Sequence, residues 1–265
     1  MERSPSPIWD WTTGRRASEA VRDPGAGVGK DSARKGLFLV LEGVEGVGKT
    51  TQARLLLEWM EGLGLPACLA REPGGTPSGE AIREILLARE GLHIQAETEL
   101  LLMLAARAAF VREVVRPLLE GGGIMLADRF ETSTFAYQGF GRGLPLEEIR
   151  RLNRFATGGL HPDLVLVLDL PWEEGRARQQ REGKAADRIE SAGGAFLERV
   201  RVGYRRLAEG GSDVVLLDGS ASPERVQEEI RSILRARFPE TFDLPRCSEE
   251  DTADSPSDDD SEDFP

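Results

Sequence analysis

The sequence predicts an α/β fold with one doubly wound, five-stranded parallel sheet that is flanked by helices on both faces. Five short runs are apolar throughout, as expected of parallel strands that are covered on both sides. Helical patterns lie between these runs, and this alternation favours parallel pairing. A glycine-rich turn follows the first run directly. In such a sheet we expect the ligand at the carboxyl ends of the strands.

The expected elements follow one another along the chain. The strands are expected at residues 37–41, 67–70, 124–127, 164–168 and 214–217. The first, LFLVL, is an unbroken apolar run, whereas ACLA at the second position is the weakest. The helices are expected at residues 50–62, 79–88, 97–120, 146–157, 171–182, 195–210 and 223–238. Each helix lies between two strands or after the last one.

The two ends of the chain differ in composition from the middle. Residues 1–35 are rich in Pro, Ser, Gly and charge, and we expect them to form a disordered extension. Residues 240–265 are expected to form a disordered acidic tail, either simply solvated, which is favoured, or used for interaction. Residues 36–239 remain as a single domain of ordinary size.

Composition and charge exclude several classes of protein. The chain is 40% hydrophobic and 30% charged, and no run approaches the roughly 18 apolar residues of a membrane span, so we expect no membrane partner. The net charge is −12, which makes the chain a poor binder of nucleic acid. Cys68 and Cys247 are far apart and cannot build a disulfide scaffold. Because the N-terminus does not look like a secretory signal, the cytoplasm is the expected location.

The most specific motif is GVEGVGKT at residues 43–50, which fits G-x-x-x-x-G-K-[ST] between an expected strand and an expected helix. Its glycines let the backbone wrap closely around phosphate, and the following helix adds the positive end of its dipole. Lys49 would bridge the β- and γ-phosphates, and Thr50 would supply a hydroxyl ligand for Mg²⁺. A chance glycine-rich turn is the alternative. The residues expected to bind ATP are Gly43, Val44, Glu45, Gly46, Val47, Gly48, Lys49, Thr50 and Thr51.

Charged residues at the ends of later strands narrow the function. No guanine-reading N-K-x-D motif is present, which disfavours a GTPase. Asp128 follows the third strand, at the usual position of an acid that lies near Mg²⁺. Arg129 beside it and Arg71 after the second strand would hold a second phosphate in line with the donor. These positions predict a phosphotransferase whose acceptor itself carries phosphate.

A basic cluster stands out in this acidic chain. Its members are Arg176, Arg178, Arg181, Lys184 and Arg188. An arginine that closes over a transferring phosphoryl group can accelerate the reaction by about 10³–10⁵. The alternative is a solvated helix face, because three glutamates are interleaved with these bases. Together with the phosphate-binding motif, the cluster favours a short arginine-rich lid.

Five segments together resemble the bacterial thymidylate kinases of the P-loop nucleoside monophosphate kinase superfamily. They are GVEGVGKTT (43–51), REPGGT (71–76), DRFETSTFAYQ (128–138), PDLVLVLD (162–169) and DRIE (187–190). The second and third segments, in this order after the P-loop, are specific together. The resemblance spans about residues 36–238. It implies the P-loop kinase fold and transfer of a phosphoryl group from MgATP to dTMP, giving dTDP for the supply of dTTP in DNA synthesis.

The resemblance also assigns roles to residues that would hold the acceptor's phosphate and sugar. Arg71 and Arg129 would grip the 5′-phosphate of dTMP. Glu45 would lie near the 3′-hydroxyl of the sugar. Tyr137 would crowd the 2′ position and so favour deoxyribose, with Gln138 adjacent to this wall.

Further residues would surround the base. Arg107 would reach the thymine edge, and Ser133 and Thr134 would line the base pocket. Met103 stands where the family usually places a phenylalanine that stacks on the base. A thioether can still cover an aromatic face, and the alternative is a core methionine.

Glycine at position 46, together with arginines in the lid, resembles the subclass whose catalytic arginine comes from the lid. Arg181 is favoured for this role, with Arg176 and Arg178 as alternatives, and Lys49 and Asp128 complete the expected catalytic set. The family also implies a homodimer. Two other functions stay open: a P-loop kinase for another small acceptor, and a nucleotide-binding module that has lost turnover.

Overall fold

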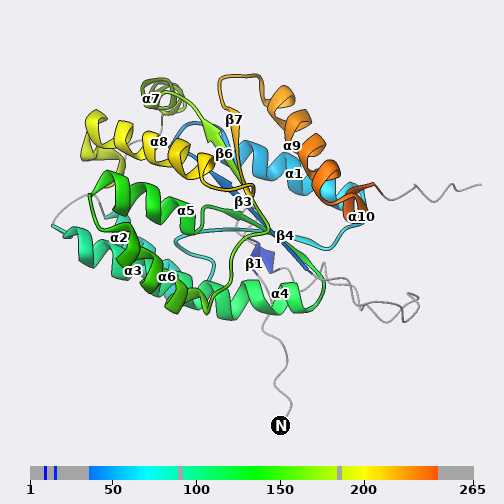
Figure 1. Ribbon diagram of the computed structural model, residues 1–265, viewed down its shortest axis with the longest axis horizontal. Coiled ribbons are helices and arrows are strands. Elements are labelled where there is room, and N and C mark those ends of the chain that lie inside the picture. The colour runs from blue at the N-terminus through cyan, green and yellow to red at the C-terminus, as the bar shows by residue number, and fades with distance from the viewer. Residues whose placement is uncertain (1–8, 11–14, 17–35, 89–91, 184–186, 244–265) are drawn as a thin grey trace, which may run out of the picture.

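The computed structural model describes residues 9–10, 15–16, 36–88, 92–183 and 187–243 (Figure 1). Its main sheet has five parallel strands in the order β4-β5-β3-β6-β7. The strands are β3 (Leu37–Glu42), β4 (Ala67–Arg71), β5 (Ile124–Asp128), β6 (Leu164–Asp169) and β7 (Val214–Asp218). All five expected strands are confirmed, and the order reverses at β3, where a doubly wound sheet binds its ligand.

Every strand is one residue longer than expected, and the additional residue is always charged. The five are Glu42, Arg71, Asp128, Asp169 and Asp218. Apolarity ends one residue before the backbone ladder does, and the charged residue has a polar partner or a place at the carboxyl edge: Glu42 accepts from backbone N–H groups, Asp169 pairs with Arg201, and Arg71 and Asp128 lie side by side. The register places Arg71 directly beside Asp128.

The expected helices are also present. They are α1 (Lys49–Gly62), α2 (Pro77–Leu87), α3 (Ala96–Phe110), α6 (Leu146–Thr157), α7 (Trp172–Arg181), α8 (Gly194–Glu209) and α9 (Pro223–Arg237). In Figure 1, α1 and α9 lie together on one side of the sheet and α8 lies on the other. Within the described residues, no helix has the length and apolarity that crossing a membrane requires.

The expected helix over residues 97–120 is continuous but not uniform. After α3 the chain makes a π-helical segment, η2 (Val111–Val115), and then α4 (Arg116–Glu120). Pro117 lies at the start of α4 and has no N–H, and its ring excludes the normal α-helical approach of the carbonyl four residues before it. The wider π turn accommodates this proline.

One helical segment was not predicted. Residues after β5 form α5 (Glu131–Thr134) and the π-helical η3 (Phe135–Gly141). Their Thr, Phe, Tyr and Gly content has low intrinsic helix propensity, so the local pattern gave no helix signal. Packing supplies it instead, since Gly141 lies close to the side chains of Phe196 and Val200 on α8. A short 3₁₀ turn, η4 (Glu190–Ala192), precedes α8.

The predictions for the two ends of the chain mostly fall outside the described residues. In the N-terminal extension, β1 (Trp9–Asp10) pairs antiparallel with β2 (Arg15–Arg16). At the other end, α10 (Pro239–Phe242) begins where we expected the acidic tail. Residues 244–265 of that tail lie outside the described part.

Aromatic packing explains why α10 belongs to the fold. Phe242 is only 4% exposed and stacks on Trp59 of α1, with ring centroids 5.2 Å apart. The guanidinium groups of Arg231 and Arg235 lie 5.3 and 5.4 Å from the same indole. The structured domain therefore extends past residue 239, to the end of this helix.

Phe242→Ala should lower the free energy of unfolding by about 2–4 kcal/mol, because it removes a buried aromatic stack. Catalytic constants should hardly change, since the P-loop lies at the opposite end of the strands. Urea unfolding and steady-state kinetics measure the two effects. Deletion of residues 246–265 is the control, and it should leave stability nearly unchanged and kcat/KM within about threefold. A neutral Phe242→Ala, or a destabilising deletion, would contradict this account.

Candidate active site

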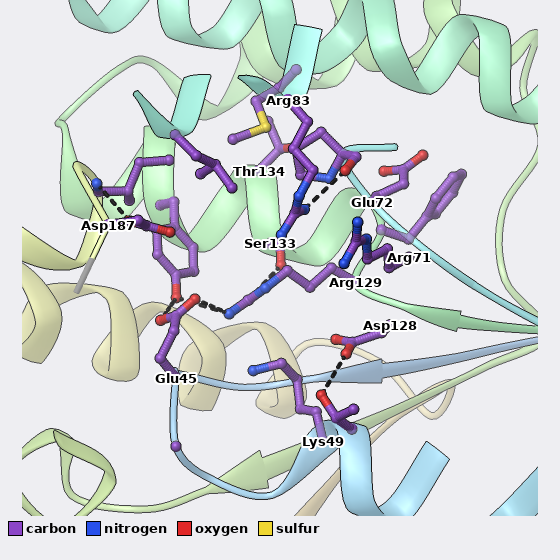
Figure 2. A pocket seen from close by; sticks show the side chains of 18 of the residues that line it. Glu45, Lys49, Arg71, Glu72, Arg83, Asp128, Arg129, Ser133, Thr134 and Asp187 are labelled. Carbon is purple, nitrogen blue, oxygen red and sulfur yellow. Dashed lines mark hydrogen bonds and ion pairs between the residues drawn. The ribbon is translucent and has the colours of Figure 1, made fainter. Parts of the chain in front are cut away.

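A cavity of about 290 Å³ opens at the carboxyl ends of β3, β4 and β5 (Figure 2). The P-loop, α2, α3 and the α5–η3 segment form most of its walls, with Gln179 from α7 and Glu182 directly after that helix. Most of the residues that the sequence predicted for ATP and acceptor line this one cavity. They are Glu45, Gly46, Gly48, Lys49, Thr50, Thr51, Arg71, Met103, Arg107, Asp128, Arg129, Ser133, Thr134, Tyr137 and Gln138.

The P-loop has the backbone that its glycines predict. Gly43, Gly46 and Gly48 all have positive φ, at 134°, 72° and 103°. Gly43 is not among the cavity-lining residues, and the side chains of Val44 and Val47 are buried in the core instead. The two valines therefore anchor the loop, while its glycines and polar residues face the cavity.

Lys49 is the first residue of α1 and is only 7% exposed. Its ammonium group donates to the carbonyl oxygens of Gly43 and Val44, at 3.0 and 2.8 Å. Burial and the nearby Arg129 lower the pKa of Lys49, and Glu45 and Asp128 act against this. The amine is thus held over the loop, close to where phosphate oxygens would lie.

Two side chains with oxygen atoms that could hold a metal ion meet at the mouth of the P-loop. The Thr50 hydroxyl donates to the Asp128 carboxylate across 3.3 Å (Figure 2). A hydroxyl and a carboxylate suit Mg²⁺, which usually keeps several waters and shares phosphate oxygens with one or two protein ligands. No group of three or more His, Cys, Asp or Glu side chains that could hold a metal occurs among the described residues. The Thr50 hydroxyl and the Asp128 carboxylate fit a metal that arrives with a nucleotide.

Arg129 lies at the centre of the cavity. Its backbone φ is +76°, unusual for a residue with a side chain, and its N–H donates to the Leu41 carbonyl across 2.9 Å. Its guanidinium donates to the Glu45 carboxylate and to the Ser133 hydroxyl (Figure 2). The strained backbone of Arg129 thus points its guanidinium group toward the P-loop.

Glu45 and Tyr137 form a second polar contact beside Arg129. The Tyr137 hydroxyl donates to Glu45 across 2.6 Å. Burial acts to raise the pKa of Glu45, but the charges of Arg129 and Lys49 outweigh it and hold that pKa below its ordinary value. Burial also raises the pKa of Tyr137 well above 10. The pair therefore consists of an ionised carboxylate and a neutral phenol.

Four arginines line the cavity from different elements: Arg71, Arg83, Arg107 and Arg129. Besides Arg129, Arg71 at the end of β4 has a side chain that is 44% exposed and lies 3.4 Å from Glu80. Arg83 on α2 donates to the Pro73 carbonyl across 2.9 Å, and burial and the charge of Arg71 lower its pKa. We did not predict Arg83, because it stands in an ordinary helical pattern and only the fold brings it to this wall.

Arg107 is more enclosed than its expected role suggests. It is 3% exposed, and its guanidinium donates to Glu72, to Thr134, to Asn153 and to the Phe130 carbonyl. The arginine thus braces the wall formed by Thr134. A direct contact between Arg107 and a base edge stays a prediction, and it would compete with these protein partners.

The lid arginines are not brought to the cavity. Arg178 donates to the Gly219 carbonyl across 3.1 Å, and Arg181 donates to Ala177 on its own helix. Arg176 shares α7 with them, and none of the three is among the cavity-lining residues that are described. Residues 184–186 of the basic cluster lie outside the described part. The catalytic role of a lid arginine therefore stays a prediction.

A family model of thymidylate kinase matches residues 41–230. The chain belongs to the thymidylate kinase family. A thymidylate kinase of Pseudomonas putida is 48% identical over 200 residues, which cover 75% of this chain and 95% of the relative. One of Thermosynechococcus vestitus is 46% identical over 220 residues, covering 78% and 90%. The crystal structure of thymidylate kinase from Ehrlichia chaffeensis superimposes with a TM-score of 0.60 at 29% identity, covering 75% of this chain and 98% of that one.

Membership of the thymidylate kinase family assigns a kinase activity to this chain.

The buried carboxylate Glu72 provides a test of the electrostatics of the cavity. Burial raises the pKa of Glu72 to about 7, against the opposing charge of Arg107. Its Oε1 atom is buried and has no hydrogen-bond partner in the described structure. The folded protein therefore keeps a proton on Glu72 at pH values where the unfolded chain has lost it. The stability that this proton contributes is fully present below about pH 4.5 and is lost as the pH rises through 7.

Glu72→Gln imitates the protonated side chain at every pH. We expect the free energy of unfolding of the variant, relative to wild type, to increase by about 1–3 kcal/mol between pH 5 and pH 8. Urea unfolding at a series of pH values measures this difference. Two stability curves that run parallel over this range would show that Glu72 is ionised throughout.

Proposed function

We propose that the protein transfers the γ-phosphoryl group of MgATP to the 5′-phosphate of dTMP, giving ADP and dTDP, and thereby supplies dTTP for DNA synthesis. The observation that carries the proposal is the convergence, in one cavity, of a P-loop with four arginines from other parts of the fold. A site for ATP alone would not need that second set of cations. The family supports dTMP as the acceptor.

The P-loop side of the cavity suits the donor. Inward-facing N–H groups and the N-terminus of α1 would bind phosphate oxygens, and Lys49 would neutralise the charge on the transferred group. Thr50 and Asp128 would hold Mg²⁺, which when bound neutralises part of the triphosphate charge. No covalent intermediate is required, because positioning and charge neutralisation are sufficient for phosphoryl transfer.

The opposite side suits a nucleoside monophosphate. Arg71 and Arg129 would hold its 5′-phosphate in line with the donor, and Arg83 adds a third positive charge. Glu45, ionised and fixed by Arg129, would accept a hydrogen bond from the 3′-hydroxyl. The ring of Tyr137 would occupy the space that a 2′-hydroxyl needs.

Charge that develops on the transferring group would be completed by an arginine of α7. We propose Arg181, or else Arg176 or Arg178, for this role. Support comes from the first turn of this helix, where the carbonyl of Gly175 lies directly against Gly46 of the P-loop. A movement of α7 about this contact would bring one of its arginines toward the phosphates.

The proposal is tested by comparing acceptors in an ATP-consumption assay. We expect dTMP to be preferred over UMP by at least about 10² in kcat/KM, because an unpaired or clashing 2′-hydroxyl costs about 1–3 kcal/mol and misaligns the acceptor. Comparison of dUMP with UMP isolates the sugar. Tyr137→Ala should relax this preference, whereas Tyr137→Phe, which keeps the ring, should retain it.

Lys49→Met provides the control for turnover and should lower kcat by about 10²–10⁴. Equal use of dTMP and other nucleoside monophosphates by the wild-type protein would favour a kinase for a different acceptor. ATP binding without dTMP-dependent release of ADP would instead indicate a nucleotide-binding module.

We also propose that the protein is a cytoplasmic homodimer. Supporting this, α3 and α6 pack together and expose large apolar side chains, with Leu101 at 56% and Phe155 at 83% exposure. Exposed apolar groups of this size often mark a protein contact. Light scattering of the purified chain should give twice the monomer mass. Phe155→Glu should shift the measured mass toward that of the monomer. A monomer mass for the wild type would contradict the dimer.

A further inference from the structure

Glu99 is a buried carboxylate on α3 to which the sequence assigned no role. It is 0% exposed, and its two oxygens accept hydrogen bonds from three different segments of the chain. Gln138 Nε2 donates to Oε1 across 2.9 Å. Arg142 donates to both oxygens, each across 3.2 Å, and Arg188 donates to Oε2 across 2.6 Å. Only a carboxylate can accept all four of these bonds.

The two arginines keep Glu99 ionised. Burial acts to raise its pKa, but the hydrogen bonds from Arg142, Gln138 and Arg188 outweigh it, and the pKa lies below its ordinary value. An ionised carboxylate has no proton to donate and accepts only. Whatever group faces Glu99 must therefore be a donor.

This constraint fixes the direction of the Gln138 side chain. The amide of glutamine has a donor end and an acceptor end, and the donor end must face Glu99. The opposite orientation would place a carbonyl oxygen against a carboxylate oxygen. Gln138 also lines the cavity, and its Oε1 accepts no hydrogen bond from any described residue. The amide consequently presents a hydrogen-bond acceptor to the ligand.

Thr134, one turn earlier, presents the complementary group. Its Oγ1 accepts from Arg107 across 2.9 Å, so its own proton is available to another acceptor. Thr134 is only 1% exposed and lines the same cavity. The wall therefore offers one acceptor and one donor, from residues one helical turn apart.

This pair matches one class of pyrimidine. Thymine and uracil carry an N3–H donor beside the C4 carbonyl acceptor, and cytosine carries an N3 acceptor beside a C4 amino donor. The N3–H and C4 carbonyl of thymine or uracil pair with the Gln138 acceptor and the Thr134 donor. The N3 atom and C4 amino group of cytosine would instead place an acceptor against an acceptor and a donor against a donor. Unpaired polar groups in a buried site are strongly disfavoured.

We propose that Glu99 is a specificity-determining positioning residue, which orients the Gln138 amide so that the base pocket accepts pyrimidines with an N3–H and rejects cytosine. The inference rests on the proposed function and concerns how that function selects its base. Glu99 need not touch the substrate, since it acts through Gln138.

The test is the ratio of kcat/KM for dTMP to that for dCMP. In the wild type this ratio should be at least about 10². Glu99→Gln replaces one accepting oxygen by an amino group and removes the constraint on Gln138, so the ratio should fall at least tenfold. The loss should appear mainly in the KM for dTMP, and the KM for ATP should not change. Gln138→Leu should lower the ratio similarly, and the double variant should fall no further, because both changes remove the same interaction.

Arg142→Gln is the matched control. It removes two hydrogen bonds from Glu99 but leaves the carboxylate facing Gln138, so it should cost stability while changing the ratio less than threefold. An unchanged ratio in Glu99→Gln, or an equal loss in Arg142→Gln, would overturn the proposal. If Glu99→Gln does not fold, Gln138→Leu decides alone, and an unchanged ratio in that variant overturns the proposal as well.

The outcomes separate this inference from the proposed function. A wild-type protein that releases no ADP with dTMP contradicts the function. An active wild type whose ratio does not respond to Glu99→Gln contradicts the inference only. Calorimetric binding of dTMP and dCMP gives the same comparison of affinities without turnover, so the orientation of Gln138 can be judged in either case.

Discussion

Glu42 ends the central strand β3 with its carboxylate fully buried, and the neighbouring parts of the active site are arranged around it. The backbone N–H groups of Phe130 and Ser133 donate to it, as do the hydroxyls of Ser133 and Tyr204. Burial raises its pKa, which shows how costly the charge is and why so many donors surround it. The chain after β5 must turn sharply to deliver them. That turn gives Arg129 its left-handed backbone and starts α5. Tyr204, which lies on α8, links that helix to the sheet through its hydrogen bond to Glu42.

Carboxylates paired with arginines recur throughout the site. Arg129 contacts Glu45, Arg107 contacts Glu72, and Glu99 holds two arginines of its own. At Glu45 and Glu99, which stay ionised, removing one partner of the pair leaves the other charge uncompensated, which costs far more than the pair contributes. The arrangement therefore serves geometry more than stability. It fixes where positive charge and hydrogen-bond donors point, in a protein whose total charge is −12.

Much of this could be predicted from the sequence, because the signals were local. Apolar runs gave the five strands, the spacing of glycines gave the P-loop, and the segment from Asp128 to Gln138 gave most of the acceptor side. What could not be predicted depends on long-range contacts. Glu72 and Arg107 are 35 positions apart and look like surface charges until the fold buries them together. The η3 helix has no local pattern either, since packing against α8 imposes it. The lid was inferred from the basic cluster and its catalytic arginine from the resemblance, and Arg176, Arg178 and Arg181 are not among the residues that line the cavity.

Gly46 and Gly175 restrict how this enzyme could evolve. The backbones of the P-loop and α7 approach so closely that a β-carbon at either position would collide with the carbonyl of the other segment. An arginine at position 46, in the loop itself, is therefore incompatible with the present location of α7. Nor can a substitution at Gly175 open the way, because that side chain meets the carbonyl of Glu45. Placing a cationic side chain at position 46 would require a concerted shift of the whole helix α7. A side chain at position 46 therefore has to be accompanied by a movement of α7, which ties the sequence of the loop to the position of the helix.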